Sequence, residues 1–436
     1  MTGCRRQAVA AALATVATFA IAGQATAAEM VTRTLSGGTA VVRTPAMPTG
    51  VTARSATVTD AATGRALWSI RPDEKRLIAS TTKIMTALVA ISRTSPDEQM
   101  AATTYRATPG ESRLGLRAGE LMTAKDLIAA LLLESANDAA DTLAVRTAGS
   151  RAKFVAAMNR RARQIGMPGT NFGNPIGLDS PRTVSTASDL AALTKVAMRE
   201  PRFSGVVGLK QATLRSGSKV RRIRNRNDLV GRYAYVDGVK TGHTVRAGYL
   251  LVGSATKGDA RVISVVMGEP SVAARNRDSL KILRFGRGFF KNYLPVSRRR
   301  ALARLPIDLQ DATAAVYPRR DIGFALRDGE RYSVTMTAAE KLAGPIAAGA
   351  RIGTARVTRN GREVAETAVV VREAIPEPPI QAVLLDTVGR LMPLILLLAI
   401  VFIIGVLILR RRATAPSGSA DRLSRSPRPP AALRRP

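Results

Sequence analysis

The sequence predicts an α+β domain, a smaller all-β domain and a single C-terminal transmembrane helix. Three patterns lead to this prediction. Helical periodicity and antiparallel strand pairs occur together over residues 53–295, as is typical of an α+β domain. Short strands with tight turns fill residues 299–374. An uninterrupted apolar run at 391–409 is about as long as a bilayer-crossing helix.

The two ends of the chain predict where the protein lies. Residues 1–27 have the features of a secretory signal: two arginines, an Ala-rich apolar stretch and the small-residue cleavage site Ala25-Thr26-Ala27. An N-terminal membrane anchor is the alternative. Three arginines follow the C-terminal apolar run, as expected on its cytoplasmic side. We therefore expect a single-pass protein of the cell membrane, with its bulk outside and a basic cytoplasmic tail at 410–436.

The composition excludes several classes of function. The formal net charge is +34, from 66 Lys and Arg against 32 Asp and Glu, and the chain has one His and one Cys. These two residues cannot build a zinc site or a disulfide, so we expect no metal and no cofactor. No nucleic-acid-binding signature is present, and we expect no nucleic-acid partner. The excess of basic residues suits anionic lipid or wall polymer, with an ordinary solvated surface as the alternative.

The elements of the larger domain follow in order along the chain. The polar segment 28–52, which Gly and Pro interrupt, is expected to be a linker, and a hairpin follows at 56–70. Apolar periodicity predicts helices at 80–92, 123–145, 151–165, 188–199 and 278–292. Three further strands are predicted at 239–244, 247–254 and 260–268.

The C-terminal part is punctuated by turn residues. Within the β-domain at 299–374, the turns are Arg327-Asp328-Gly329 and Arg359-Asn360-Gly361. The Pro-rich segment at 375–390 predicts a stiff tether that leads into the membrane helix.

Three short motifs occur in order: Ser80-Thr81-Thr82-Lys83, Ser135-Ala136-Asn137 and Lys240-Thr241-Gly242. Each is common when taken alone. Their joint occurrence, with the first at a helix start, the second at a helix end and the third on a strand, is far more specific and is known from serine acyltransferases.

Ser80 and Lys83 form the predicted catalytic pair. A Ser at a helix start is often only an N-cap. Lys83, however, follows one turn later on the same face, within reach of the Ser80 hydroxyl. Burial of this apolar helix lowers the pKa of the lysine, and a neutral amine can then act as a base. A hydroxyl needs such a base to become a nucleophile.

The other two motifs are interpreted as substrate contacts and a proton path. The Ser135 hydroxyl can pass a proton to a leaving group, and the Asn137 amide can hold a substrate backbone; both are otherwise helix-end caps. Lys240 and Thr241 start a strand whose edge can pair with an extended peptide, where they can bind a terminal carboxylate. An ordinary edge lysine is the alternative. Gly242 allows close approach of another backbone.

His243 is the only histidine and follows this motif directly. A role as general base is one interpretation of its side chain. We favour a contribution from its backbone N–H, which together with that of Ser80 can stabilise an oxyanion.

These stretches resemble the low-molecular-mass penicillin-binding proteins of the serine D-alanyl-D-alanine carboxypeptidase family. The resemblance covers most of residues 53–290, and it is weaker over the β-domain. Supporting stretches are Asn174-Pro175-Ile176-Gly177-Leu178-Asp179, Ser185-Thr186-Ala187-Ser188-Asp189-Leu190 and Asn225-Arg226-Asn227-Asp228-Leu229. It implies a fold like that of β-lactamases and penicillin-binding proteins.

The resemblance also implies the reaction. Ser80 attacks the carbonyl between the two terminal D-alanines of a peptidoglycan stem pentapeptide, and Lys83 takes its proton. Ser135 helps deliver a proton to the leaving D-alanine, Asn137 orients the donor, and Lys240 and Thr241 bind the terminal carboxylate. Water then hydrolyses the acyl-enzyme. β-Lactams are expected to acylate the same serine.

The chain departs from many relatives in two ways. Many relatives have Gly where this chain has Ala136. Many also have a His where this chain has Ile176, and another His near Thr183. These changes leave open the substrate preference of that loop and the deacylation rate. The alternatives to a carboxypeptidase are a β-lactamase or D,D-endopeptidase of the same fold, or a non-hydrolysing penicillin-binding sensor or wall scaffold.

Overall fold

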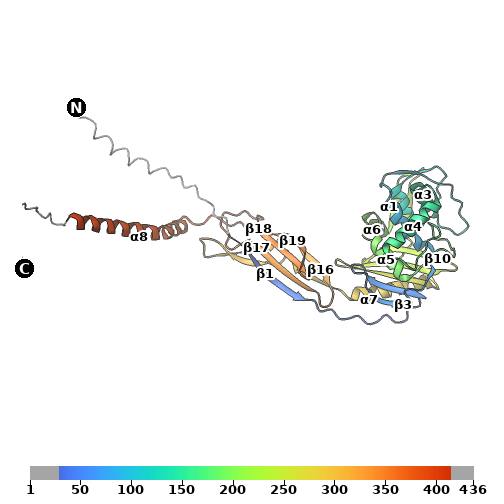
Figure 1. The fold of residues 1–436 in the computed structure, drawn as a ribbon, viewed down its shortest axis with the longest axis horizontal. Helices are drawn as coiled ribbons and strands as arrows, with labels where there is room; N and C mark the ends of the chain where they lie inside the picture. Colours follow the sequence, from blue (N-terminus) through green and yellow to red (C-terminus); the bar gives the residue numbers. More distant parts are fainter. Residues whose placement is uncertain (1–28, 414–436) are drawn as a thin grey trace, which may run out of the picture.

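The computed structural model describes residues 29–413, which form two domains and a long C-terminal helix (Figure 1). The mixed α and β domain and the β-domain follow one another along the long axis, and the helix leads away from the β-domain (Figure 1). The expected signal at 1–27 lies outside the described residues, as does all but the start of the tail expected at 410–436. The α+β, all-β and helical parts occur in the predicted order.

The larger domain is built on an antiparallel sheet of five strands in the order β10-β11-β12-β2-β3. The strands are β2 (Ser55–Asp60), β3 (Ala66–Ile70), β10 (Val236–Thr244), β11 (Gly248–Lys257) and β12 (Ala260–Glu269). β10 and β3 are therefore the two outer strands. The predicted hairpin and the three later strands all belong to this one sheet.

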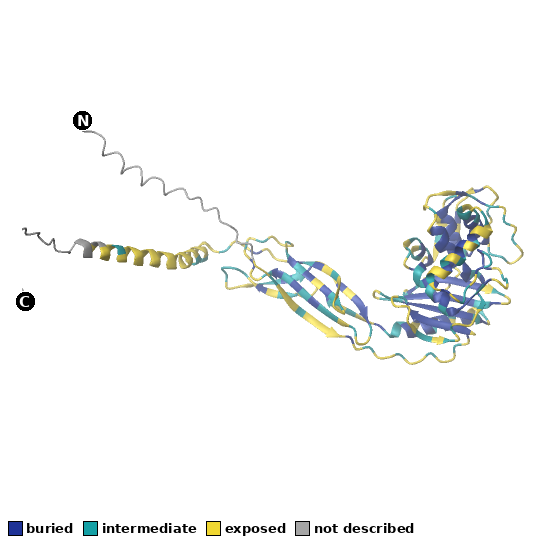
Figure 2. Ribbon diagram, in the orientation of Figure 1, coloured by how far each residue is buried: buried dark blue, intermediate teal, exposed yellow. Residues whose placement is uncertain are grey.

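Both faces of the sheet are covered, as the dark interior of Figure 2 shows. Alternate residues of a strand point to opposite faces. On β12, Ile263 and Val265 join the core beneath the helices, whereas Val262 and Val266 join the core beneath α7 (Val272–Gly288). The β12 residues at 260–269 therefore serve two separate cores.

The helices that cover the first face lie close to their predicted positions, except for α6, which was not predicted. They are α1 (Lys83–Ile91), α2 (Ala124–Ala129), α3 (Asn137–Ala148), α4 (Arg151–Ile165), α5 (Ala187–Ala197) and α6 (Pro201–Val207). Their ends follow ordinary capping rules. Ser150 accepts a hydrogen bond from the Lys153 N–H at the start of α4, and Gly166, with φ of 83°, ends it.

Several elements differ from the sequence prediction. The helix expected at 123–145 is interrupted at Ser135, between the π-helical turn Ala130–Glu134 and α3. The helix expected at 278–292 is α7, which begins and ends earlier. Pairs of short strands were not predicted: β4 (Arg76–Leu77) with β7 (Val184–Ser185), β5 (Gln99–Ala101) with β6 (Leu121–Thr123), and β8 (Gln211–Leu214) with β9 (Arg221–Arg224).

The β-domain contains a six-stranded sheet in the order β1-β17-β18-β19-β15-β14, with β13 and β16 paired beside it. The strands are β1 (Met30–Thr39), β13 (Lys291–Val296), β14 (Ala303–Pro306), β15 (Thr313–Pro318), β16 (Ile322–Leu326), β17 (Arg331–Ala339), β18 (Arg351–Arg359) and β19 (Arg362–Val371). Because β13 pairs with β16, the β-domain begins earlier than the expected boundary at 299.

The expected linker at 28–52 needs correction. Residues 30–39 form β1, the edge strand that pairs with β17 from Met30 opposite Ala339 to Thr39 opposite Arg331. The partner strand lies about 300 residues away in the sequence, and Gly37 and Gly38 weaken the local strand signal. The rest of the expected linker, residues 40–52, is a strap that leads from β1 to the larger domain.

The C-terminal helix is longer than expected. α8 (Ile380–Ala413) begins directly after Pro379, whose carbonyl accepts hydrogen bonds from the N–H groups of Ala382 and Val383. The tether expected at 375–390 therefore ends at 379. The apolar part, Ile380–Ile408, has 29 residues and is exposed along its length (Figure 2). It is long enough to cross a bilayer, consistent with a membrane anchor.

Candidate active site

Ser80 lies where the helical part of the larger domain meets the sheet. It belongs to a short 3-10 turn, Ala79–Thr82, that leads into α1. The carbonyl of Ile78 accepts hydrogen bonds from the N–H and the hydroxyl of Thr81, which fixes this turn. Every residue of α1 is buried, as its apolar sequence predicts, and Ser80 itself is half-buried.

Lys83 is the group that meets the Ser80 hydroxyl. Its Nζ lies 3.0 Å from Ser80 Oγ and also donates a hydrogen bond to the carbonyl of Ile176. Burial lowers the pKa of Lys83 to about 7; Glu111 opposes this shift, and Arg226 adds to it. At neutral pH a substantial fraction of this lysine is therefore a free amine in contact with the hydroxyl.

The loop that carries Ile176 is held tightly against the turn of Ser80. Asn174 Oδ1 accepts hydrogen bonds from the N–H groups of Ile176, Gly177 and Leu178. Gly177 has φ of +87°, and a Cβ built on it would lie 2.1 Å from the carbonyl oxygen of Ala79. No other residue type fits here, because the two backbones are in direct contact.

Replacing Gly177 with Ala is expected to displace the Ser80 turn. The added methyl group must move the Ala79 backbone, and a misplacement of about 1 Å at a catalytic group costs about 100-fold in rate. We expect acylation by a fluorescent penicillin to slow by about this factor. Gly149→Ala is the matched control, because Gly149 also has positive φ, 78°, but no atom lies within 4 Å of a Cβ there. Equal effects in both variants would show that backbone strain alone is responsible.

Ser135 and Asn137 lie at the break between the π-helical turn and α3. Ser135 adopts a left-handed conformation with φ of 63°, which ends the turn. Both side chains are buried, 4% and 5% exposed. The π-helical turn and α3 both pack against α1, so the break faces the helix that begins at Lys83. The Asn137 Nδ2 donates to Glu111 Oε2 at 2.7 Å.

β10 brings the third motif to Ser80. As an outer strand it pairs only with β11, which leaves the other edge free of strand partners. A Cβ on Gly242 would lie 3.3 Å from the Ser80 N, so this glycine permits a close approach of the two backbones. The ring of His243 stacks on its cross-strand neighbour Tyr249, with centroids 4.0 Å apart.

The site around Lys240 is electropositive. Lys240 is 1% exposed, and its Nζ donates to the carbonyl of Thr241 at 3.1 Å. Burial holds the pKa of Lys240 well below its ordinary value, and the nearby charges of Lys83, Arg226 and Arg275 lower it further, with only Glu134 opposing. An anionic group bound here would relieve this repulsion.

Three residues of this site were not predicted. Arg226 donates to the carbonyl of Glu134 at 2.8 Å and pairs with its carboxylate at 2.6 Å. Glu111 and Tyr105 come from a long irregular loop between β5 and β6. Arg226 lies inside a stretch that the family resemblance already marked, but nothing in the sequence pattern distinguishes Glu111 or Tyr105.

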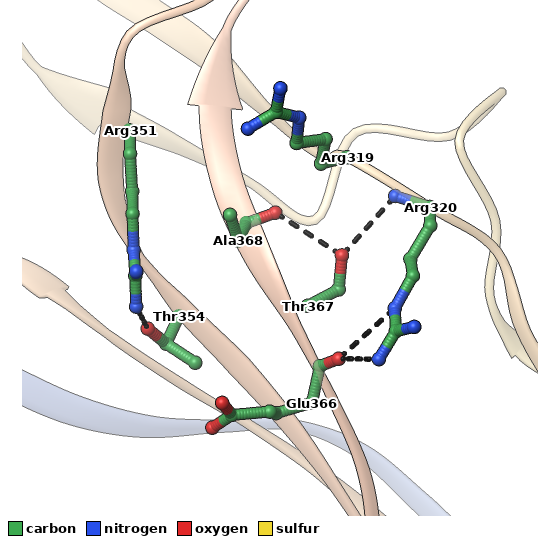
Figure 3. A pocket seen from close by; sticks show the side chains of 7 residues that line it. All are labelled: Arg319, Arg320, Arg351, Thr354, Glu366, Thr367 and Ala368. Carbon is green, nitrogen blue, oxygen red and sulfur yellow. Dashed lines mark hydrogen bonds between the residues drawn. The ribbon is translucent and has the colours of Figure 1, made fainter.

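A separate pocket lies in the β-domain, between β15, β18 and β19 (Figure 3). Its lining residues are Arg319, Arg320, Arg351, Thr354, Glu366, Thr367 and Ala368. Two of the arginines are engaged: Arg320 donates to the Glu366 carbonyl and Arg351 to the Thr354 hydroxyl, each at 2.7 Å. The lining has no Ser-Lys pair and lies in a different domain from Ser80.

Comparison with known proteins gives one consistent result. The family model described as D-alanyl-D-alanine carboxypeptidase, peptidase S11, matches residues 41–271. The chain is 32% identical to the D-alanyl-D-alanine carboxypeptidase DacC of Escherichia coli over 345 residues, which cover 75% of this chain and 85% of that protein.

Solved structures agree with this match. The structure is similar to penicillin binding protein 5 from Haemophilus influenzae, with a TM-score of 0.54 and 28% identity over 76% of this chain and 100% of that one. It is also similar to penicillin-binding protein D2 from Listeria monocytogenes in its cefotaxime-bound form, with a TM-score of 0.51 and 31% identity over 56% and 99% of the two chains.

Proposed function

We propose a mechanism, residue by residue, for this chain, which belongs to the D-alanyl-D-alanine carboxypeptidase family, peptidase S11, and is a serine D-alanyl-D-alanine carboxypeptidase. The family, the fold class and the enzyme activity predicted from the sequence are thereby confirmed. The observation that carries the mechanism is the 3.0 Å contact between Ser80 Oγ and the buried Nζ of Lys83.

Acylation begins at this pair. Ser80 Oγ attacks the carbonyl carbon between the two terminal D-alanines of a peptidoglycan stem peptide, while its proton passes to Lys83 Nζ. The carbonyl oxygen becomes an oxyanion, which accepts hydrogen bonds from the backbone N–H groups of Ser80 and His243. The closeness of Gly242 to the Ser80 N supports this pairing of donors. The His243 ring is stacked on Tyr249, which supports Lys83, and not the His243 side chain, as the base.

The terminal carboxylate of the substrate binds to Lys240 and Thr241. The cations around Lys240 support this role, because a bound carboxylate supplies the negative charge that the group of Lys83, Arg226 and Arg275 lacks. The free edge of β10 lets the extended stem peptide add as a further strand. A carboxylate at this point requires a substrate that ends in a free D-alanine.

Ser135 and Asn137 complete the site. Ser135 helps to deliver a proton to the amine of the leaving D-alanine, and Asn137 orients this donor and holds the substrate backbone. Cleavage of the C–N bond releases D-alanine and leaves the acyl group on Ser80. Water then attacks the acyl carbon, the Ser80 oxygen regains its proton, and a tetrapeptide stem is released.

The same site is proposed to accept β-lactams, which acylate Ser80; the cefotaxime-bound relative supports this. The long apolar helix α8 supports a single-pass anchor that places both domains on the wall side of the cell membrane, with the basic tail in the cytoplasm. The net positive charge and the three arginines of the β-domain pocket (Figure 3) support contact with anionic lipid or wall polymer.

The function is tested on the full chain in detergent micelles with three compounds. A peptide ending in D-Ala-D-Ala, a cross-linked stem-peptide dimer and a fluorescent penicillin are supplied separately. We expect release of one D-alanine per peptide and little cleavage of the dimer, because the site binds a free terminal carboxylate. We also expect a stable penicillin label.

Each alternative gives a different result. Faster cleavage of the dimer than of the linear peptide would indicate an endopeptidase. Rapid loss of the penicillin label, with product in solution, would indicate a β-lactamase. A stable label without release of D-alanine would indicate a sensor or scaffold.

A further inference from the structure

The loop between β5 and β6, residues 102–120, carries a carboxylate into the active site. We propose that Glu111 is a positioning residue: its carboxylate fixes the side-chain amide of Asn137 in one orientation and ties this loop to the catalytic helices. The inference deepens the proposed function, because it rests on Asn137 as a contact of substrate and proton donor.

The geometry joins Glu111 to Asn137 directly. Asn137 Nδ2 donates to Glu111 Oε2 at 2.7 Å, and Tyr105 donates its hydroxyl to the same oxygen. The other carboxylate oxygen, Oε1, accepts from the N–H and the hydroxyl of Thr108, at 3.0 and 2.6 Å. The backbone of the loop adds a further link, since the Asn137 N–H donates to the Ser112 carbonyl at 2.8 Å. Each of these four contacts of the Glu111 carboxylate is therefore a hydrogen bond that it accepts.

An acceptor of this kind decides which way the Asn137 amide points. A side-chain amide can turn by 180°, which exchanges its oxygen and its NH₂ group with little change of shape. An ionised carboxylate only accepts hydrogen bonds, so it requires the NH₂ group. Partial burial raises the pKa of Glu111, but the hydrogen bonds from Thr108, Tyr105 and Asn137 outweigh this and lower the pKa to about 2. Glu111 is therefore ionised, and this orientation leaves the Asn137 oxygen available for substrate.

The loop is held firmly enough to fix Glu111 in place. Asp138, the neighbour of Asn137 on α3, accepts hydrogen bonds at 2.8 to 3.0 Å from three backbone N–H groups of the loop, those of Leu114, Gly115 and Leu116. At the end of the loop, Glu120 pairs with Arg221 on β9 at 2.9 Å, and both side chains are almost fully buried. Before Glu111, the Thr103 hydroxyl donates to Asp141 Oδ2 on α3 at 2.6 Å, so Glu111 lies between anchored stretches.

Glu111 also faces the charge of Lys83. The charged groups around Lys83 come from several elements: Glu111 from the loop, Arg226 from the segment after β9, Lys240 from β10, and Glu134, which is paired with Arg226, from the π-helical turn. The Glu111 carboxylate favours the protonated amine and so raises the pKa of Lys83, against the effects of burial and Arg226. A change of charge at 111 must therefore change the pH at which Lys83 becomes a base.

The test compares the full chain with its Glu111→Gln variant across about pH 5 to 9, the range in which a base of this pKa titrates. The measurements are the rate of penicillin acylation and the kcat/KM of D-alanine release. At the alkaline end we expect both rates to fall about tenfold. The charge-assisted hydrogen bond to Asn137 is replaced by a neutral one, which no longer decides which way the Asn137 amide points. Because the pKa of Lys83 falls when the negative charge at 111 is removed, the midpoint of the acid limb of the pH profile moves to lower pH. The loss of rate is therefore smaller at acid pH.

Two further variants separate positioning from general structure. Tyr105→Phe removes one donor to Glu111 without changing its charge, and we expect a smaller loss of rate with an unchanged midpoint. Glu98→Gln is the matched control: Glu98 is an exposed carboxylate beside β5 that accepts from the Ser95 N–H and not from Asn137, and this variant is expected to behave as the parent.

The inference is overturned if Glu111→Gln has parental rates and midpoint, or if it loses rate equally at every pH together with thermal stability. A parent that releases no D-alanine but is labelled by penicillin would reject the proposed function alone, since the acylation rates of the variants still test Glu111. If Glu111→Gln does not fold, an unaltered Tyr105→Phe rate counts against the proposal.

Discussion

Replacing Ser80 with Ala is expected to abolish both D-alanine release and penicillin labelling. The variant keeps the fold but has no oxygen to form the acyl bond, and the loss of a serine nucleophile costs several orders of magnitude in kcat. We expect at least about a thousand-fold loss of D-alanine release. The release is measured with a peptide that ends in D-Ala-D-Ala, and the acyl-enzyme by the mass of the penicillin-treated protein.

The matched control is Ser69→Ala on β3, the outer strand at the opposite edge of the sheet from β10. Ser69 is exposed, and this variant is expected to keep parental activity. Penicillin labelling that survives in Ser80→Ala would place the nucleophile at another residue and reject the mechanism.

Replacing Lys83 with Met is expected to stop acylation while it preserves or raises thermal stability. The substitution removes the base but keeps a flexible side chain of similar length in an apolar site. We expect penicillin acylation to slow by about a thousand-fold, as for other general-base removals that disable a nucleophile. Lys153→Met, on the exposed face of α4, is the control and should acylate at the parental rate.

The pH dependence of the parent follows from the same lysine. Only neutral Lys83 can accept the Ser80 proton, and its pKa is about 7. Acylation should therefore rise through pH 7 and fall about tenfold per pH unit well below it.

The stability effect has the same origin. Because the folded pKa lies below the ordinary lysine value, the unfolded chain binds more protons between these two values. The parent thus gains stability as the pH rises from about 7 towards 10.5, and the stabilisation of Lys83→Met relative to the parent is largest below this range. Thermal unfolding at several pH values measures this difference in stability.

Acylation that is retained by Lys83→Met would contradict Lys83 as the base and would instead support His243.

Local sequence signals predicted most of the secondary structure. The helix at 151–165 was correct at both ends, because a capping serine and a terminal glycine mark it in the sequence itself. The strands β11 and β12 were also predicted close to their observed bounds; they are consecutive in the sequence and pair with each other. These elements depend on neighbours within a few residues, which the sequence shows directly.

Elements that depend on distant partners were missed. β1 is a strand only because β17 supplies its hydrogen bonds, and for this reason the expected linker began at residue 28 instead of residue 40. The break at Ser135 is also hidden, since the flanking residues are good helix formers and only tertiary packing forces a left-handed residue there.

The chemistry of this protein could be predicted from its amino-acid sequence. The types and order of Ser80, Lys83 and the other motif residues predict a serine acyltransferase, because the proposed nucleophile, base and carboxylate-binding cation are all present in the sequence. The tertiary structure decided how these groups behave. The pKa of Lys83 near 7, the fit of Gly177 against Ala79 and the contact of Glu111 with Asn137 all depend on burial and on distances between remote segments. Charge and hydrogen bonding change with the surroundings of a group, and only the folded chain creates those surroundings.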